Sequence, residues 1–129
     1  MKNTKRLIIC IICIISILSI PTSSFAATYL TTSSRGVPNL AYTEDNIQWY
    51  TDSTSITNYD AWQSKSGICV QNDGITKLNS STTTRWDFNC SNTFLVGAVI
   101  GGVTLGFSHT CIDQCKVYKD GTNTWTYED

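Results

Sequence analysis

One long apolar run constrains the fold of this 129-residue chain most, and it occupies residues 94–107 with the sequence FLVGAVIGGVTLGF. Valine, isoleucine, leucine and phenylalanine favour strands, and each of its four glycines would weaken a helix by about 1 kcal/mol relative to alanine. The glycine pair at 101–102 predicts a two-residue hairpin turn between two strands. In the second strand Val103, Leu105 and Phe107 alternate with smaller or polar residues, so we expect this face to pack inward as the centre of the fold.

The first 26 residues have the organisation of a secretory signal peptide. Three basic residues precede an apolar stretch at 7–20, and a polar segment that begins with a proline follows it. This order is typical of signal peptides, and we expect cleavage after Ala26. A membrane-spanning helix needs about 20 apolar residues, so the shorter stretch favours a signal over a retained anchor. The sequence therefore predicts a secreted, extracellular protein with a leader of bacterial type.

The charge of the part that follows the signal limits its partners. Residues 27–129 contain ten acidic and six basic residues, which gives a net charge of −4. Nucleic-acid binding depends on clustered lysine and arginine, and none cluster here. The same deficit argues against electrostatic attraction to anionic lipid.

Four cysteines remain after the signal: Cys69, Cys90, Cys111 and Cys115. An even number in an exported chain of this size predicts two disulfides, because the extracellular environment is oxidising. In an antiparallel meander the last three would gather at one end of the sheet. We therefore expect Cys90–Cys111 with Cys69–Cys115, or Cys90–Cys115 with Cys69–Cys111.

The rest of the pattern consists of short alternating segments separated by turn residues. This spacing predicts an all-β, mainly antiparallel fold, a small disulfide-stapled sandwich or a barrel-like meander. One short helix is expected near 58–65, with Thr57 or Asn58 as its cap, Asp60 in its first turn and Gly67 as its terminator. We divide the chain after the signal into an extended N-terminal arm at 27–45 and a single β-rich domain at 46–129.

The sequence gives little support to catalysis or metal binding. Its single histidine, His109, is close to Ser108, Cys111 and Asp113, but adjacent residues of a strand point to opposite faces. Structural zinc sites usually pair two short cysteine spacings, and only Cys111 and Cys115 have one. We therefore expect no enzyme, no metal and no cofactor.

Aromatic residues are the better functional signal, because a small core cannot enclose four tryptophans and six tyrosines. We assign three tryptophans to the core: Trp62, Trp86 and Trp125. We assign four other residues to an exposed ligand-binding surface: Trp49, Tyr50, Tyr118 and Tyr127. Exposed aromatic rings on a sheet can stack on sugars or contact a protein.

These patterns predict a small secreted, non-catalytic binding protein whose aromatic sheet surface contacts a protein or a cell-wall glycan. An alternative is an antimicrobial, bacteriocin-like or toxin-like effector that acts on membranes through the glycine-rich hairpin at 94–107. That run contains two GxxxG spacings, but it is too short to span a bilayer as a helix, so we rank it second. A small hydrolase that uses His109 is a further alternative.

Overall fold

The computed structural model describes residues 26–100 and 103–128, and its regular structure there is entirely β-strand. The strands are β1 (Ala27–Val37), β2 (Ala41–Thr51), β3 (Ile56–Ser66), β4 (Val70–Lys77), β5 (Arg85–Ile100), β6 (Val103–Tyr118) and β7 (Asn123–Glu128). They form two sheets with the orders β1-β2-β3 and β4-β5-β6-β7, and all neighbouring strands are antiparallel. The predicted all-β antiparallel fold is confirmed. The predicted signal peptide lies, except for its last residue, outside the described residues.

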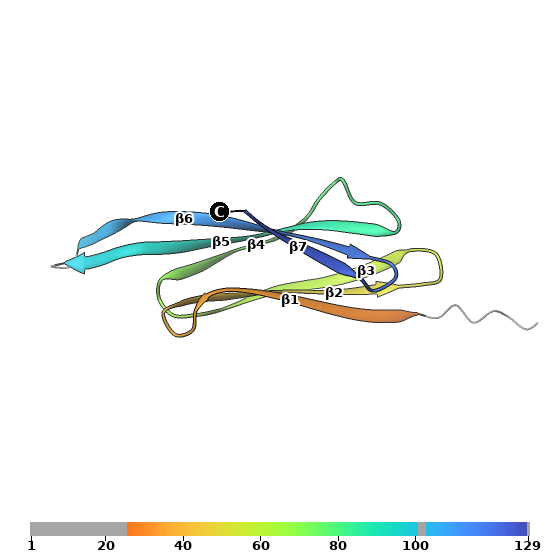
Figure 1. The fold of residues 1–129 in the computed structure, drawn as a ribbon, viewed down its shortest axis with the longest axis horizontal. Helices are drawn as coiled ribbons and strands as arrows, with labels where there is room; N and C mark the ends of the chain where they lie inside the picture. The colour runs from red at the N-terminus through yellow and green to blue at the C-terminus, as the bar shows by residue number, and fades with distance from the viewer. Residues whose placement is uncertain (1–25, 101–102, 129) are drawn as a thin grey trace, which may run out of the picture.

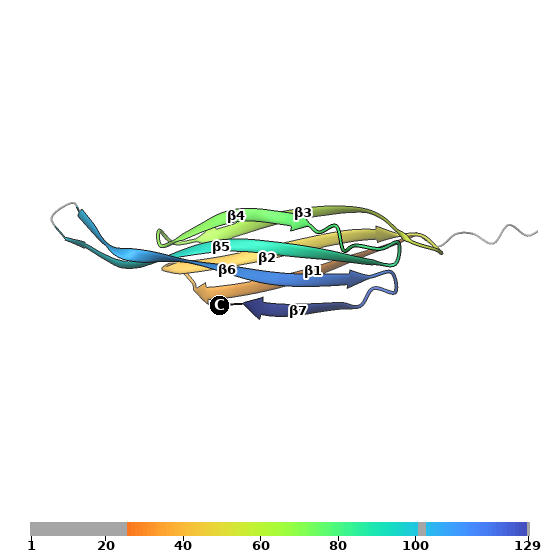
Figure 2. The same ribbon diagram turned by 90° about the horizontal axis from the view of Figure 1, so that it is seen from above.

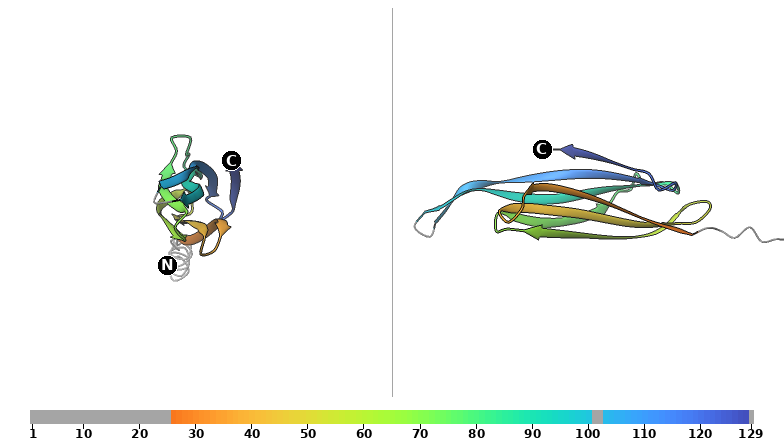
Figure 3. Two further views of the ribbon diagram at one scale, coloured as in Figure 1. Left: turned by 90° about the vertical axis from the view of Figure 1, so that its left-hand side faces the viewer. Right: turned by 60° about the horizontal axis from the view of Figure 1, so that its bottom comes forward.

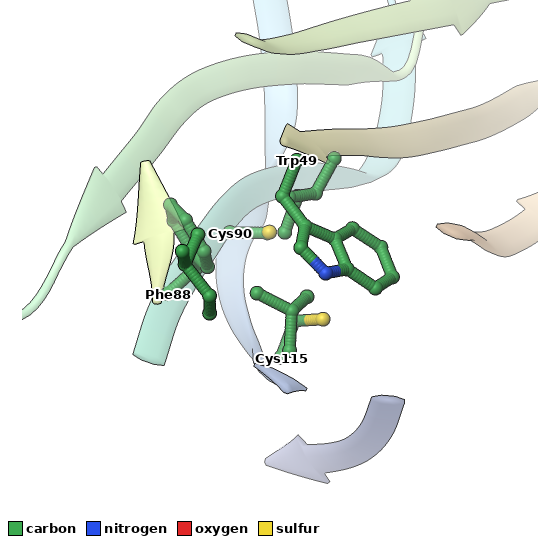
Figure 4. Close-up of a cluster of buried hydrophobic side chains, with 7 residues drawn as sticks. Trp49, Phe88, Cys90 and Cys115 are labelled. Atoms are coloured by element: carbon green, nitrogen blue, oxygen red, sulfur yellow. The ribbon is translucent and has the colours of Figure 1, made fainter. Parts of the chain in front are cut away.

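The two sheets pack face to face as a sandwich (Figures 1 and 3). Their apolar contact lies toward the end of β2 and the start of β5, and its buried members are Ile47, Trp49, Ile56, Phe88, Cys90, Cys115 and Val117. Figure 4 shows the centre of this cluster, where Trp49 and Phe88 flank two cysteines. Tyr59 of β3 closes the cluster, with its ring centroid 5.0 Å from that of Phe88.

The helix predicted near 58–65 is wrong, because these residues belong to strand β3. Ile56 is buried, and Tyr59 and Ala61 pack against the core, whereas the residues between them are more exposed. This alternation has the period of a strand. Capping residues are local signals worth about 1 kcal/mol, and pairing with β2 along the whole of β3 outweighs them.

The segment at 27–45, predicted to be an extended arm, instead forms β1 and the first part of β2. The two strands pair from Ala27↔Thr51 to Val37↔Ala41. The sequence looks like a linker because its inward side chains are polar. Thr31 is buried and accepts a hydrogen bond from Trp125 Nε1 at 2.9 Å, so hydroxyl groups take the place of apolar side chains here.

The structure contains no disulfide among the four cysteines after the signal, so the predicted stapling is absent. Cys90 lies opposite Asp113, midway between Cys111 and Cys115 on the same inward face. The register is thus compatible with the expected neighbourhood of these three residues. Desolvation raises the pKa of the Cys115 thiol to about 12 and also raises that of Cys90, so both thiols are uncharged at neutral pH.

The register also excludes both expected partners of Cys69. The carbonyl of Cys69 accepts a hydrogen bond from the N–H of Leu95, whereas Cys115 lies opposite Phe88. Seven residues of strand correspond to about 23 Å. Cys111 is separated from Cys69 by the whole width of β5, which with the offset along the strand also exceeds the roughly 7 Å limit between bridged Cα atoms. The predicted position of Cys69 is wrong because β5 and β6 are each one long strand, whereas the sequence predicted two short strands in the place of each.

Candidate functional site

A two-stranded hairpin extends beyond the sandwich. Strands β5 and β6 each have 16 residues, whereas β2 and β3 have 11. The ladder between β4 and β5 ends at Val70↔Phe94, and that between β6 and β7 ends at Ile112↔Glu128. We call residues 95–100 and 103–108 the projecting hairpin. Figures 1 and 2 show it reaching past the end of both sheets.

The projecting hairpin is exposed, so the prediction that this run is the buried centre of the fold is wrong. Phe107 is 70% exposed, Val96 52% and Leu95 48%. Val96 continues the row of side chains that is buried at Cys90 and Asn92, but this row passes beyond the end of the opposite sheet. The predicted alternation of side chains is present, but the opposite sheet does not extend far enough to cover them. The side chains at 98–100 and 103–105 and the glycine pair at 101–102 lie outside the described residues.

Exposed apolar side chains also surround the base of the projecting hairpin. Val37 is the last residue of β1 and Leu40 lies in the β1–β2 connection. Ile68, which is 89% exposed, lies in the β3–β4 connection. Backbone hydrogen bonds hold these turns against β5, because Cys69 donates to the Leu40 carbonyl at 3.3 Å and accepts from Leu95 at 2.9 Å. A groove of about 420 Å³ opens here, lined by Ile68, Cys69, Leu95, Val96, Gly97, Gly106, Phe107 and Ser108.

This surface carries no charge of its own. No aspartate, glutamate, lysine or arginine occurs between Asp87 and Asp113, an interval that includes the whole projecting hairpin. Polar side chains begin at Ser108 and His109. They continue where the hairpin meets the sandwich, where Thr93 bonds to Thr110 at 2.7 Å and to Asp73. The described part of the projecting hairpin is therefore uncharged and mainly apolar, and it stands on a polar base.

A buried polar cluster lies inside the sandwich below this base. Asn92 of β5 donates to Asp45 Oδ2 of β2 at 2.9 Å, and Thr43 donates to Asn92 Oδ1 at 2.9 Å. Near the same cluster, Arg35 of β1 forms an ion pair with Asp113 of β6. These bonds join the two sheets where β5 and β6 leave the sandwich, so they fix the direction of the projecting hairpin.

Burial of this cluster affects its carboxyl groups. Desolvation raises the pKa of Asp45, and the charge of Asp113 adds to the rise. Hydrogen bonds from Gln63 and Asn92 and the charge of Arg35 lower the pKa and offset part of this effect. The cluster is inaccessible to a substrate, so we assign it a structural role.

The four residues predicted to form an aromatic binding surface do not gather in one place. Trp49 is 1% exposed and donates its indole N–H to the Tyr118 carbonyl at 2.9 Å, so its assignment to the surface is wrong. Tyr50 and Tyr118 are half-buried. Tyr127 is exposed on β7, where the guanidinium of Arg35 lies 5.5 Å from its ring centroid.

The assignment of Trp62 to the core is wrong. This residue is exposed on the outer face of β3, opposite Asn46. Tyr50 lies on the same face and donates a hydrogen bond to Asp60 at 2.9 Å. The error followed from the predicted helix, because only the strand period places Trp62 and Asp60 together on the outer face.

His109 does not form a catalytic arrangement in the structure. It is exposed and lies opposite Phe94, whereas Ser108 lies opposite Leu95, so the two side chains point to opposite faces. Within residues 26–100 and 103–128, no group of three or more histidine, cysteine and acidic side chains is placed to hold a metal ion. The same residues include no helix long and apolar enough to cross a membrane.

Comparison with known proteins gives no relative: no family model, no curated protein and no solved structure matches this chain.

Proposed function

We propose that this protein is a secreted, non-catalytic effector that binds lipid membranes by inserting the projecting hairpin into one leaflet. The observation that carries this proposal is the exposure of Val96 and Phe107 on a hairpin that extends beyond the sandwich. Large contiguous apolar patches exposed on monomeric soluble proteins usually mark sites that contact a protein, a ligand or a membrane. This exposure favours the membrane alternative over the aromatic surface.

The dimensions of the projecting hairpin suit a single leaflet. β5 contributes six residues beyond Phe94, and β6 contributes the six residues that precede His109. At about 3.3 Å per residue, six residues reach roughly 20 Å. Half of a typical hydrocarbon core is about 15 Å thick, and a complete crossing would need about 9–11 residues per strand. The polar base at Thr93 and Thr110 would then lie at the headgroups.

The energetic argument depends on the side chains that would leave water. Full burial of an exposed leucine, valine or phenylalanine side chain contributes about 1.5–3 kcal/mol. Because Leu95, Val96 and Phe107 are only 48%, 52% and 70% exposed, their insertion would together supply about 3–5 kcal/mol. The net negative charge and the absence of nearby clustered lysine or arginine give no attraction to anionic headgroups. Binding is therefore expected to be strongest on zwitterionic lipid.

Co-sedimentation with phosphatidylcholine vesicles tests the proposal. The wild type is expected to bind, and the double variant Val96→Asp, Phe107→Asp to lose at least 100-fold in affinity. A 100-fold loss corresponds to about 2.8 kcal/mol. An aspartate at the bilayer centre costs about 2.5–3.5 kcal/mol and less near the headgroups, and the double variant also removes the apolar burial of Val96 and Phe107, so the two effects together suffice.

The matched control is Leu30→Asp, which places the same charge on an exposed residue of β1, near the end of the sandwich remote from the hairpin. It should bind as the wild type does. All variants should keep the wild-type circular dichroism, because the changed residues are exposed. Absence of wild-type binding, or equal losses in the control and the double variant, would refute insertion through the hairpin.

A second candidate is glycan binding on the outer face of β2 and β3, and the exposed ring of Trp62 favours it. Gln48, Tyr50 and Asp60 form a chain of hydrogen bonds on that face, and such groups beside an aromatic ring suit a sugar. We expect Trp62→Ala to reduce retention on insoluble cell-wall glycan at least tenfold. Tyr127→Ala, which removes an exposed ring on β7, is the control. Equal retention of Trp62→Ala and wild type would exclude this surface.

A further inference from the structure

The projecting hairpin has two open edges. Beyond Val70↔Phe94 and Ile112↔Glu128, no described strand pairs with the outer side of β5 or β6. The N–H of Leu95 bonds outward to Cys69, which identifies the backbone groups of Leu95 as pointing away from β6. Because this direction alternates along an antiparallel strand, Gly97 also points its N–H and C=O outward.

The partner strand has the same property. Gly106 and Ser108 lie opposite Gly97 and Leu95, and in such pairs both residues direct their backbone groups away from each other. In water these groups are solvated. In hydrocarbon they have no partner, and unpaired N–H and C=O groups are among the most costly groups to place there.

We infer that membrane-bound copies of this chain assemble by pairing the β5 edge of one projecting hairpin with the β6 edge of the next. This inference rests on the proposed membrane binding, because only transfer into lipid makes the open edges costly. A second copy is the occupant that fits, since it brings an uncharged edge of the same length and to the same depth.

The direction of the strands determines which edges meet. Copies that insert from the same side all point their tips the same way, so β5 runs toward the tip in each copy and β6 runs away from it. Antiparallel pairing then requires β5 against β6 of the neighbour. This contact is head-to-tail and leaves a free edge at each end, so copies add until a ring closes.

Within one projecting hairpin, β5 and β6 lie close together at the pair Gly97↔Gly106. A Cβ at Gly106 would meet the Val96 carbonyl and lie 2.7 Å from the Gly97 Cα, so this position has no room for a side chain.

Chemical cross-linking on phosphatidylcholine vesicles, at equal amounts of bound protein, tests the assembly. The wild type is expected to give dimers and higher multiples with vesicles and only monomer without them. Gly97→Pro removes one outward N–H and leaves the β5–β6 ladder intact, because proline is tolerated where the N–H faces away from the paired strand. It should bind vesicles within twofold of the wild type and give at least tenfold less cross-linked product.

Gly97→Ala is the matched control, since it keeps the N–H and should cross-link as the wild type does. A wild type that binds vesicles but stays monomeric would overturn the assembly and leave the proposed function standing. A Gly97→Pro variant with unchanged cross-linking would also overturn it. Absence of vesicle binding by the wild type would refute the proposed function, and the assembly with it.

Discussion

Phe88→Ala is expected to lower the free energy of unfolding by about 3–5 kcal/mol, as large-to-small changes in a closed core do. Phe88 is fully buried, packs on Tyr59 and lies opposite Cys115 in the ladder. Strands lie on both sides of the ring and can only partly close the cavity that alanine would leave. Urea unfolding followed by tryptophan fluorescence measures the change. A domain of this size has about 5–15 kcal/mol in total, so the loss is a large part of its stability.

The chain offers a control of identical chemistry in Phe107→Ala. Phe107 is 70% exposed on the projecting hairpin, and we expect its removal to change the free energy of unfolding by less than about 0.5 kcal/mol. The same variant should weaken vesicle binding. A loss of stability at Phe107 as large as that at Phe88 would mean that the hairpin is covered within the protein, which would contradict the proposed function.

Arg35→Ala is expected to destabilise the fold by about 3–5 kcal/mol at neutral pH, because it leaves the buried carboxylate of Asp113 without its ion-pair partner. The Asp113 side chain is 2% exposed and that of Arg35 is 21% exposed, so water screens the pair only weakly. The loss should be measurable by urea unfolding at several pH values between about 7 and about 4.5.

The pH series has a defined direction. The pKa of Asp45 is raised in the folded protein above its ordinary value of 3.8, and removal of Arg35 raises the pKa further, because that charge lowers it. A carboxyl group with a raised folded pKa destabilises the fold when it is ionised. This cost is complete above the folded pKa and disappears as the pH falls toward 3.8. The stability lost in Arg35→Ala should therefore be partly recovered on acidification.

A double variant, Arg35→Met with Asp113→Leu, serves as the control. Replacement of both partners by apolar side chains leaves no buried unpaired charge, so it should recover most of the stability that Arg35→Ala loses at neutral pH. If the double variant is as unstable as Arg35→Ala, packing of the arginine stem and not the charge of Asp113 explains the loss.

The sequence alone determined that the fold is antiparallel β, because alternation between inward and outward residues is a local property of each segment. It also determined that the run at 94–107 forms two strands, and the pair Ile100↔Val103 confirms where they meet. At β3, local capping signals compete with this period and predict a helix wrongly. The pairing of β3 with β2, which decides the outcome, is not visible in the segment itself.

The tertiary structure decided which alternating faces are covered. Alternation shows that Val96 and Phe107 belong with the inward rows, but their burial depends on the length of the opposite sheet, which ends before it reaches them. For the same reason Trp49 is inside and Trp62 outside, although both alternate with polar neighbours. The polar cluster around Asp45 could not be foreseen either, because its members come from β1, β2, β3, β5 and β6 and satisfy one another only when both sheets are in place. A strand's own residues specify its two faces, and only the neighbouring sheet determines which face loses contact with water.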